Sequence, residues 1–332
     1  MKHILLITTG GTIACQMTDS GLAPALSPAE LLSHISYGSC RIDFLPLMNI
    51  DSTNMEPAHW LMLAGAIRDN YDAYDAFIIA HGTDTMAYTA SALSYLIQNS
   101  RKPILLTGAQ RPIRDEDTDA RINLQDCILY ALDDRAHGVC LVFGGLVIAG
   151  TRCRKMRTKS YHAFESINHP ELARICDGQV LLFIDDKDLI TEPVVFYDEL
   201  CTRVLLLKLV PGTDGELLTR VADLYDAVIL ESFGVGGLPE YGRPTWENAL
   251  AEWTASGKSI FLTTQVVLEG SDMGIYSVGK SIKKKYRLLE AFDMTPEALI
   301  TKIMWILSRT KQPDEIRRLL YKTINHDILL RD

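Results

Sequence analysis

Short apolar runs recur along the first half of the chain, and each ends at a cluster of small or polar residues. The runs cover residues 4–7, 76–80, 104–106 and 139–143, and Gly, Thr or His directly follows each of them. Short, fully apolar runs separated by helical stretches are typical of parallel strands that are buried on both faces. The pattern therefore predicts an α/β fold with a mainly parallel sheet in its first half.

A helix is predicted after the second of these runs. Residues 86–99 contain neither Gly nor Pro, and Leu93, Leu96 and Ile97 give them an apolar stripe. Thr83, Asp84 or Thr85 can cap its first turn, because short polar side chains accept hydrogen bonds from the exposed N–H groups there.

The second half repeats the pattern with runs at 204–207, 227–230 and 260–262, and Gly, Ser or Thr again lies near each end. Periodic apolar residues from Thr295 onward predict helices that are interrupted at Pro313. We therefore expect a second set of parallel strands, followed by a helical C-terminus.

Two α/β domains are the predicted architecture. The larger N-terminal domain is expected over residues 1–187, with a mainly parallel sheet sandwiched by helices. A linker is expected over 188–207, where Pro193 lies in a stretch of mixed polarity. The smaller C-terminal parallel-sheet domain is expected over 208–332.

Composition narrows the class of protein. Of 332 residues, 47% are hydrophobic and 23% are charged, which is ordinary for a soluble globular protein, and the net charge of −9 argues against general nucleic-acid binding. No apolar run is long enough to cross a membrane. The seven cysteines form no CxxC pair, which indicates free thiols in a reducing cytoplasm.

Motifs for cofactors and metals are absent from the sequence. There is no glycine-rich phosphate-binding motif, no GxSxG nucleophile turn and no pair of histidines at metal-ligand spacing. We therefore expect neither a metal ion nor an organic cofactor.

Chemistry-bearing residues remain at the strand ends, where ligands of open α/β sheets bind. Thr12 follows a double glycine, and Thr83 and Asp84 follow the second apolar run. A threonine hydroxyl becomes a nucleophile when a base activates it, and Lys155 is a candidate base if the arginines around it disfavour its charged form. This set fits acyl transfer through a threonine nucleophile.

Structural roles compete with this interpretation. Taken singly, Thr83 and Asp84 are more typical of a helix cap than of a catalytic group. The basic stretch 151–159 is typical of a solvated loop, and His81 in its apolar context is typical of a hydrogen-bonded core histidine.

Two segments carry a resemblance to a known family. Residues 9–14 (TGGTIA) and 81–93 (HGTDTMAYTASAL) resemble the two signatures of bacterial-type L-asparaginases, and the second is closest to the cytoplasmic type I branch. The similarity continues through residues 103–110 and 163–168 to 234–237, and so covers nearly the whole chain.

The resemblance implies hydrolysis of L-asparagine to L-aspartate and ammonia through a β-aspartyl ester, with 1–187 as the catalytic domain. Thr12 would be the nucleophile, and Thr83, Asp84 and Lys155 would form a second catalytic cluster. Ser52 would bind the substrate carboxylate and Asp84 its amino group. The other residues expected to bind substrate are Gly11, Asp51, Thr53 and Thr83.

Two features depart from the family pattern. Leu22 stands where the family usually has a tyrosine in the loop after the first signature, and leucine cannot exchange a proton. The segment 115–119 (DEDTD) is unusually acidic, and the sequence offers no account of it.

The resemblance also implies a homodimer or homotetramer in the cytoplasm, with no nucleic-acid or membrane partner, and permits weak glutaminase activity and a regulatory asparagine site. One alternative is the ammonia-supplying subunit of a tRNA-dependent amidotransferase; the basic segment 280–287 favours it, whereas only two residues before the first strand argue against it. Another alternative is a non-catalytic amino-acid sensor.

Overall fold

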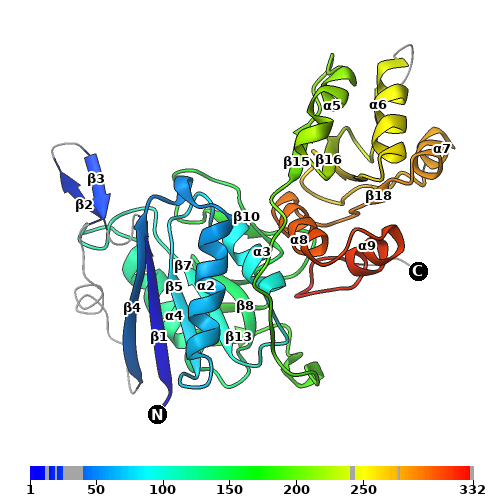
Figure 1. Cartoon of the computed structure of the whole chain (residues 1–332). Helices are drawn as coiled ribbons and strands as arrows, with labels where there is room; N and C mark the ends of the chain where they lie inside the picture. The colour runs from blue at the N-terminus through cyan, green and yellow to red at the C-terminus, as the bar shows by residue number, and fades with distance from the viewer. Residues whose placement is uncertain (12–14, 19–20, 25–39, 240–243, 276, 330–332) are drawn as a thin grey trace. The chain divides into compact units, whose positions relative to one another are not determined.

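The computed structural model describes residues 1–11, 15–18, 21–24, 40–239, 244–275 and 277–329. The chain divides into two compact units (Figure 1). The first contains Met1–Asp198 and Ile324–His326, and the second contains Glu199–Thr323 and the residues from Asp327 onward. Each unit is built on its own β-sheet.

The first unit contains an eight-stranded sheet in the order β13-β12-β9-β8-β7-β5-β1-β4. Its strands are β1 (His3–Gly10), β4 (Arg41–Ile50), β5 (Ala76–Ala80), β7 (Pro103–Thr107), β8 (Gly138–Phe143), β9 (Leu146–Ala149), β12 (Ala173–Cys176) and β13 (Gln179–Leu182). The five strands from β4 to β8 pair in parallel, and β9, β12 and β13 continue the sheet in antiparallel pairs. All four apolar runs of the first half form parallel strands, so that prediction is confirmed.

The α-helices in the described part of this unit are α2 (Pro57–Asn70), α3 (Met86–Leu96) and α4 (Ala120–Leu132). Leu124 and Ile128 of α4 belong to the same buried cluster as Leu6 and Ile78 of the sheet. Ten of the eleven α3 residues are buried, so this helix lies inside the unit rather than on its surface.

The end of α3 differs from the prediction of a helix over 86–99. Residues Ile97–Gln98 form the short strand β6, which pairs with β14 (Val195–Phe196), and Asn99 has a positive φ of 60°. Pairing with β14 therefore ends the helix at Leu96, three residues before the predicted end at residue 99. Thr85 occupies the cap position, but its hydroxyl donates to the Ser52 carbonyl instead.

The described residues of this unit also form two hairpins and two 3-10 turns. β2 (Cys15–Thr18) pairs with β3 (Gly21–Pro24), and β10 (Cys153–Lys155) pairs with β11 (Phe164–Ser166). The basic stretch 151–159 is therefore not entirely a solvated loop, because its centre is a strand. The 3-10 turns are η2 (Ser52–Asn54) and η3 (Lys187–Leu189).

The second unit contains a four-stranded parallel sheet of β15 (Val204–Lys208), β16 (Ala227–Ser232), β17 (Ser259–Thr264) and β18 (Leu289–Glu290). Its helices are α5 (Glu216–Val221), η4 (Ala222–Leu224), α6 (Pro244–Ala255), α7 (Ser277–Lys285), α8 (Pro296–Arg309) and α9 (Pro313–Leu320). Trp246 and Trp253 of α6 are fully buried in its core. The predicted parallel sheet and the helical break at Pro313 are confirmed.

Six cysteines in the described part of the chain are free thiols, and four of them are buried. Within the same ranges, none of the helices has the length and hydropathy needed to cross a membrane.

Candidate active site

Three main-chain segments meet at the carboxyl ends of β1 and β5. A Cβ atom on Gly11, whose φ is +81°, would lie 2.4 Å from the main-chain nitrogen of Gly82. A Cβ atom on Gly82 would in turn lie 2.6 Å from Oγ of Ser52. The contacts require glycine at both positions, because any side chain there would push the segments apart. Residues from both signature segments therefore lie beside Ser52.

Ser52 begins η2, directly after β4, and its side chain is buried. The preceding Asp51 caps this turn: its Oδ1 accepts hydrogen bonds from the Thr53 main-chain nitrogen at 2.9 Å and from the Thr53 hydroxyl at 3.0 Å. Thr85 donates to the Ser52 carbonyl at 2.8 Å, which ties the turn to the start of α3. Asp51 and Thr53 are exposed, so the buried Ser52 is the residue of this turn that is held most firmly.

Lys155 joins the two residues that follow Gly82. Its Nζ donates to Oγ1 of Thr83 at 2.8 Å and to Oδ1 of Asp84 at 2.6 Å. Thr83 is buried, whereas the Asp84 side chain is 58% exposed and so remains accessible to a ligand. The helix-cap interpretation of Thr83 and Asp84 is therefore wrong, because both side chains contact a lysine more than 70 positions away in the sequence.

Two of the three arginines near Lys155 in sequence have polar partners of their own. Arg152 is fully buried and its Nε donates to the carbonyl of His326. Arg157 forms an ion pair with Glu165 at 2.6 Å. Nζ of Lys155 instead contacts a hydroxyl and a carboxylate.

Gln110, which the sequence did not assign to the site, extends this chain of hydrogen bonds. The Thr83 hydroxyl receives a hydrogen bond from Lys155 and donates its own proton to Oε1 of Gln110 at 3.4 Å. The only signal in the sequence was that Gln110 is a polar residue shortly after the third apolar run.

The acidic segment 115–119 holds the Gln110 turn in place. The carboxylate of Asp119 accepts hydrogen bonds from the main-chain nitrogens of Gln110 and Arg111, and from Nδ2 of Asn123. Asp117 forms an ion pair with Arg111. The acidic segment, for which the sequence offered no account, therefore stabilises the turn that carries Gln110.

His81, the residue before Gly82, belongs to a chain of hydrogen bonds that starts at Trp60 and ends at the Gly82 carbonyl. Nε1 of Trp60 donates to the Thr89 hydroxyl at 3.0 Å, and that hydroxyl lies 2.9 Å from Nε2 of His81. Nδ1 of His81 lies 2.7 Å from the Gly82 carbonyl, which only accepts. Nδ1 therefore carries the proton and Nε2 accepts from Thr89. The imidazole is neutral, as a core histidine, and it orients the Gly82–Thr83 peptide.

Acid should weaken the fold through His81. Complete burial lowers the pKa of His81 from 6.5 to about 4. Between these values the unfolded chain binds a proton that the folded chain does not, so stability falls as the pH falls from 6.5 towards 4. We expect this residue to remove about 2–3 kcal/mol of unfolding free energy between pH 7 and pH 4.5.

Urea unfolding at the two pH values measures this effect. The matched variant is His81→Asn, which keeps a donor for the Gly82 carbonyl and does not titrate, so its stability should depend less on pH. Equal pH dependence in the two proteins would contradict the assignment of His81.

Two glycine substitutions should change stability in opposite directions. Gly82→Ala would place a Cβ atom 2.6 Å from the Ser52 side chain, and we expect it to destabilise the fold by about 1–3 kcal/mol. Gly65→Ala on α2 meets no atom within 4 Å and should stabilise the fold by up to about 1 kcal/mol through helix propensity. Thermal unfolding measures both, and a stabilised Gly82→Ala variant would show that the turn is not closely packed.

The sequence-predicted site residues fall into two groups. Gly11, Ser52, Thr83, Asp84 and Lys155 come together in the first unit, and Asp51 and Thr53 flank Ser52. Thr12 lies outside the described residues, and for Leu22 the structure describes the strand, β3, but not the side chain. Over the described ranges, no group of three or more His, Cys, Asp or Glu side chains is placed to hold a metal ion.

Comparison with known proteins covers almost the whole chain. The family profile "Asparaginase, N-terminal" matches residues 3–187, and the profile "Glutaminase/Asparaginase C-terminal domain" matches residues 203–320. An L-asparaginase of Thermococcus kodakarensis is 35% identical over 98% of both chains. A subunit of the glutamyl-tRNA(Gln) amidotransferase of Pyrococcus abyssi is 30% identical over 96% of this chain and 75% of that protein. The solved structure of the thermostable L-asparaginase from Thermococcus kodakarensis superposes with a TM-score of 0.91 at 33% identity, and the match covers 99% of this chain and 100% of that chain.

Proposed function

Because the chain belongs to the asparaginase family, we propose that it hydrolyses L-asparagine to L-aspartate and ammonia. The observation that carries this proposal furthest is the Lys155–Thr83–Asp84 cluster. Thr83 and Asp84 directly follow Gly82, which lies against both Gly11 and Ser52. Hydrolysis of a carboxamide needs a nucleophile, a proton relay and an oxyanion site in one place. The cluster supplies charged and hydroxyl groups beside the loop that leads to Thr12.

We assign the binding roles from position and charge. The substrate α-carboxylate binds near the buried Ser52, and the α-amino group binds the exposed carboxylate of Asp84. We assign Gly11, Asp51 and Thr53 to substrate binding as well, because Asp51 and Thr53 flank Ser52 and Gly11 approaches Gly82. These contacts orient the side-chain amide towards Thr12.

The reaction then proceeds in two half-reactions. The Thr12 oxygen attacks the amide carbon, main-chain N–H groups of the turn that bears Thr83 stabilise the oxyanion, and ammonia leaves as the β-aspartyl ester forms. Water then attacks the ester carbon and releases aspartate. The hydroxyl proton of Thr12 departs with ammonia and water restores it, so the Thr83–Lys155 pair needs only to relay protons.

Leu22 makes this relay more important in this chain. A leucine at this position cannot take the proton of Thr12, as a tyrosine can. We therefore assign proton transfer to the Lys155–Thr83–Gln110 chain of hydrogen bonds rather than to residue 22.

Ammonia release from free asparagine tests the function. The purified protein, without RNA or a partner enzyme, should release ammonia from asparagine, and glutamine should react about 10–200-fold less efficiently because it carries one extra methylene. Ammonia release that requires a misacylated tRNA would instead indicate the amidotransferase activity for which the Pyrococcus relative is named. Asparagine binding without any turnover would indicate a sensor.

Assembly, location and cofactor use also belong to the proposal. We expect a homodimer or homotetramer in the cytoplasm, which the free thiols and the asparaginase resemblance support, and turnover that a metal chelator does not change. Sedimentation equilibrium measures the assembly. A sigmoidal dependence of the rate on asparagine would add a regulatory binding site to this scheme.

A further inference from the structure

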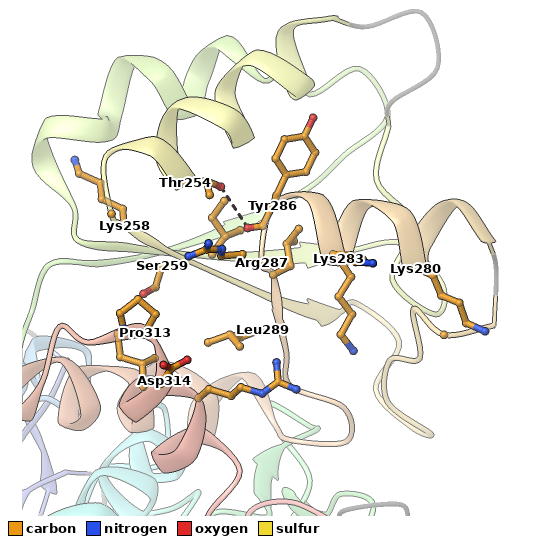
Figure 2. A pocket seen from close by; sticks show the side chains of 17 residues that line it. Thr254, Lys258, Ser259, Lys280, Lys283, Tyr286, Arg287, Leu289, Pro313 and Asp314 are labelled. Carbon is orange, nitrogen blue, oxygen red and sulfur yellow. Dashed lines mark hydrogen bonds between the residues drawn. The ribbon is translucent and has the colours of Figure 1, made fainter.

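A separate cavity of about 730 Å³ lies within the second unit (Figure 2). It is formed by the end of α6, the start of β17, α7, the turn after α7 and the first residues of α9. Its cationic lining residues are Lys258, Lys280, Lys283, Lys284, Arg287 and Arg317. Asp314 is the one carboxylate among the described residues that line it. This charge is opposite in sign to the net charge of −9 of the whole chain.

Most of this positive charge is not neutralised by the protein. Lys283 forms an ion pair with the fully buried Glu290 at 2.6 Å. Lys258 donates to the carbonyl of Ala222, and Arg317 lies over the ring of Tyr321. The Lys258 ammonium lies at a carbonyl that does not line the cavity, so it is not counted here. The other lining cations apart from Lys283 have no carboxylate partner within the described ranges, so the cavity keeps a formal excess of three positive charges over Asp314.

The origin of these cations separates the cavity from a solvated helix face. Lys280 and Lys284 come from α7, Arg287 from the turn after it, Lys258 from the segment before β17 and Arg317 from α9. A solvated face would present the charges of one element, whereas the cations that line this cavity come from four separate segments. Like charges gathered in this way repel one another unless an anion binds between them.

Lys285 provides a contrast within the same basic run. It does not line the cavity; its Nζ pairs with Glu247 at 3.4 Å and lies over the ring of Tyr286. Within the basic segment 280–287, four cations therefore line the cavity, whereas Lys285 does not.

We propose that this cavity binds the phosphate groups of a small polyanion, such as a nucleoside triphosphate or an inorganic polyphosphate chain. A formal excess of three positive charges matches a multiply charged phosphate chain, whereas a monocarboxylate or a zwitterionic amino acid would neutralise little of it. The hydroxyl of Ser259, for which no partner appears among the described residues, adds a neutral donor to the cavity. This site goes beyond the proposed function, and its occupancy does not depend on asparagine hydrolysis.

Titration calorimetry of the full chain tests the site, with sodium tripolyphosphate and ATP as probes in low-salt buffer. We expect saturable binding of one molecule per chain, weakened by added sodium chloride. The double variant Lys284→Ala, Arg287→Asn should weaken binding by at least about tenfold, since it removes two charged contacts. Arg287 is replaced with asparagine rather than alanine because its φ is 51°, a backbone conformation that asparagine tolerates better than alanine.

Two further variants separate the cavity from surface charge in general. Asp314→Asn should tighten binding severalfold because it removes the one lining carboxylate, and Lys285→Ala should leave binding unchanged. Equal affinity for tripolyphosphate and ATP would identify the phosphate chain as the bound group, and tighter binding of ATP would identify a nucleotide; both support the site. The absence of binding at millimolar tripolyphosphate, preferential binding of aspartate, or RNA binding that Lys285→Ala weakens as much as Lys284→Ala would each overturn the proposal.

Discussion

Replacing Thr12 with alanine is expected to lower kcat for asparagine by at least about 10³-fold. The hydroxyl oxygen of Thr12 forms the bond to the amide carbon in the proposed mechanism, so no ester can form without it. The groups assigned to the α-carboxylate and the α-amino group, Ser52 and Asp84, are untouched. KM should therefore change much less than kcat, since the loss falls on the transition state.

The matched control is Thr12→Ser, which keeps a hydroxyl at the same position and should retain far more activity than the alanine variant. Acid quenching during turnover, followed by mass spectrometry, should detect a β-aspartyl ester on the wild-type chain and none on Thr12→Ala. Unchanged turnover by Thr12→Ala would remove Thr12 from the mechanism and leave the family assignment intact.

The strands that the sequence predicts well are those buried on both faces. β5 and β8 lie in the interior of the sheet, where water is excluded from both sides and every position is apolar. β4 was missed because it is an edge strand with mostly half-buried residues and with Pro46 in its middle. An edge strand needs neither a continuous apolar run nor a main-chain donor at every position. Its sequence therefore lacks the pattern by which the others were recognised.

The site was predicted unevenly for a similar reason. The glycines and hydroxyls at strand ends were visible because local sequence determines strand ends. Local rules failed for Thr83 and Asp84. Both resemble helix caps in the sequence, but in the structure their side chains contact Lys155 of β10. The roles of Gln110 and Asp119 depend on how the turn after β7 folds back on α4. Neither spacing nor periodicity encodes such long-range contacts.

Replacing Lys155 with methionine is expected to lower kcat by at least about 10³-fold with little change in stability. The substitution keeps an unbranched side chain of similar length, but it removes the cation that donates to both Thr83 and Asp84. Asp84 is more than half exposed, so the loss of its ion pair should cost about 1 kcal/mol or less. Steady-state kinetics and thermal unfolding of the same preparation measure the two effects.

Arg157→Met is the control for this experiment, because Arg157 belongs to the same basic stretch and pairs with Glu165 instead of the cluster. It should keep nearly full activity. Lys155→Arg keeps the charge but replaces a compact ammonium with a planar guanidinium, so we expect it to recover only part of the lost rate. A large gain from arginine would mean that charge alone is needed at this position, and that proton transfer through Lys155 is not. Full activity in Lys155→Met would reduce Lys155 to a structural contact and exclude it from the proposed relay.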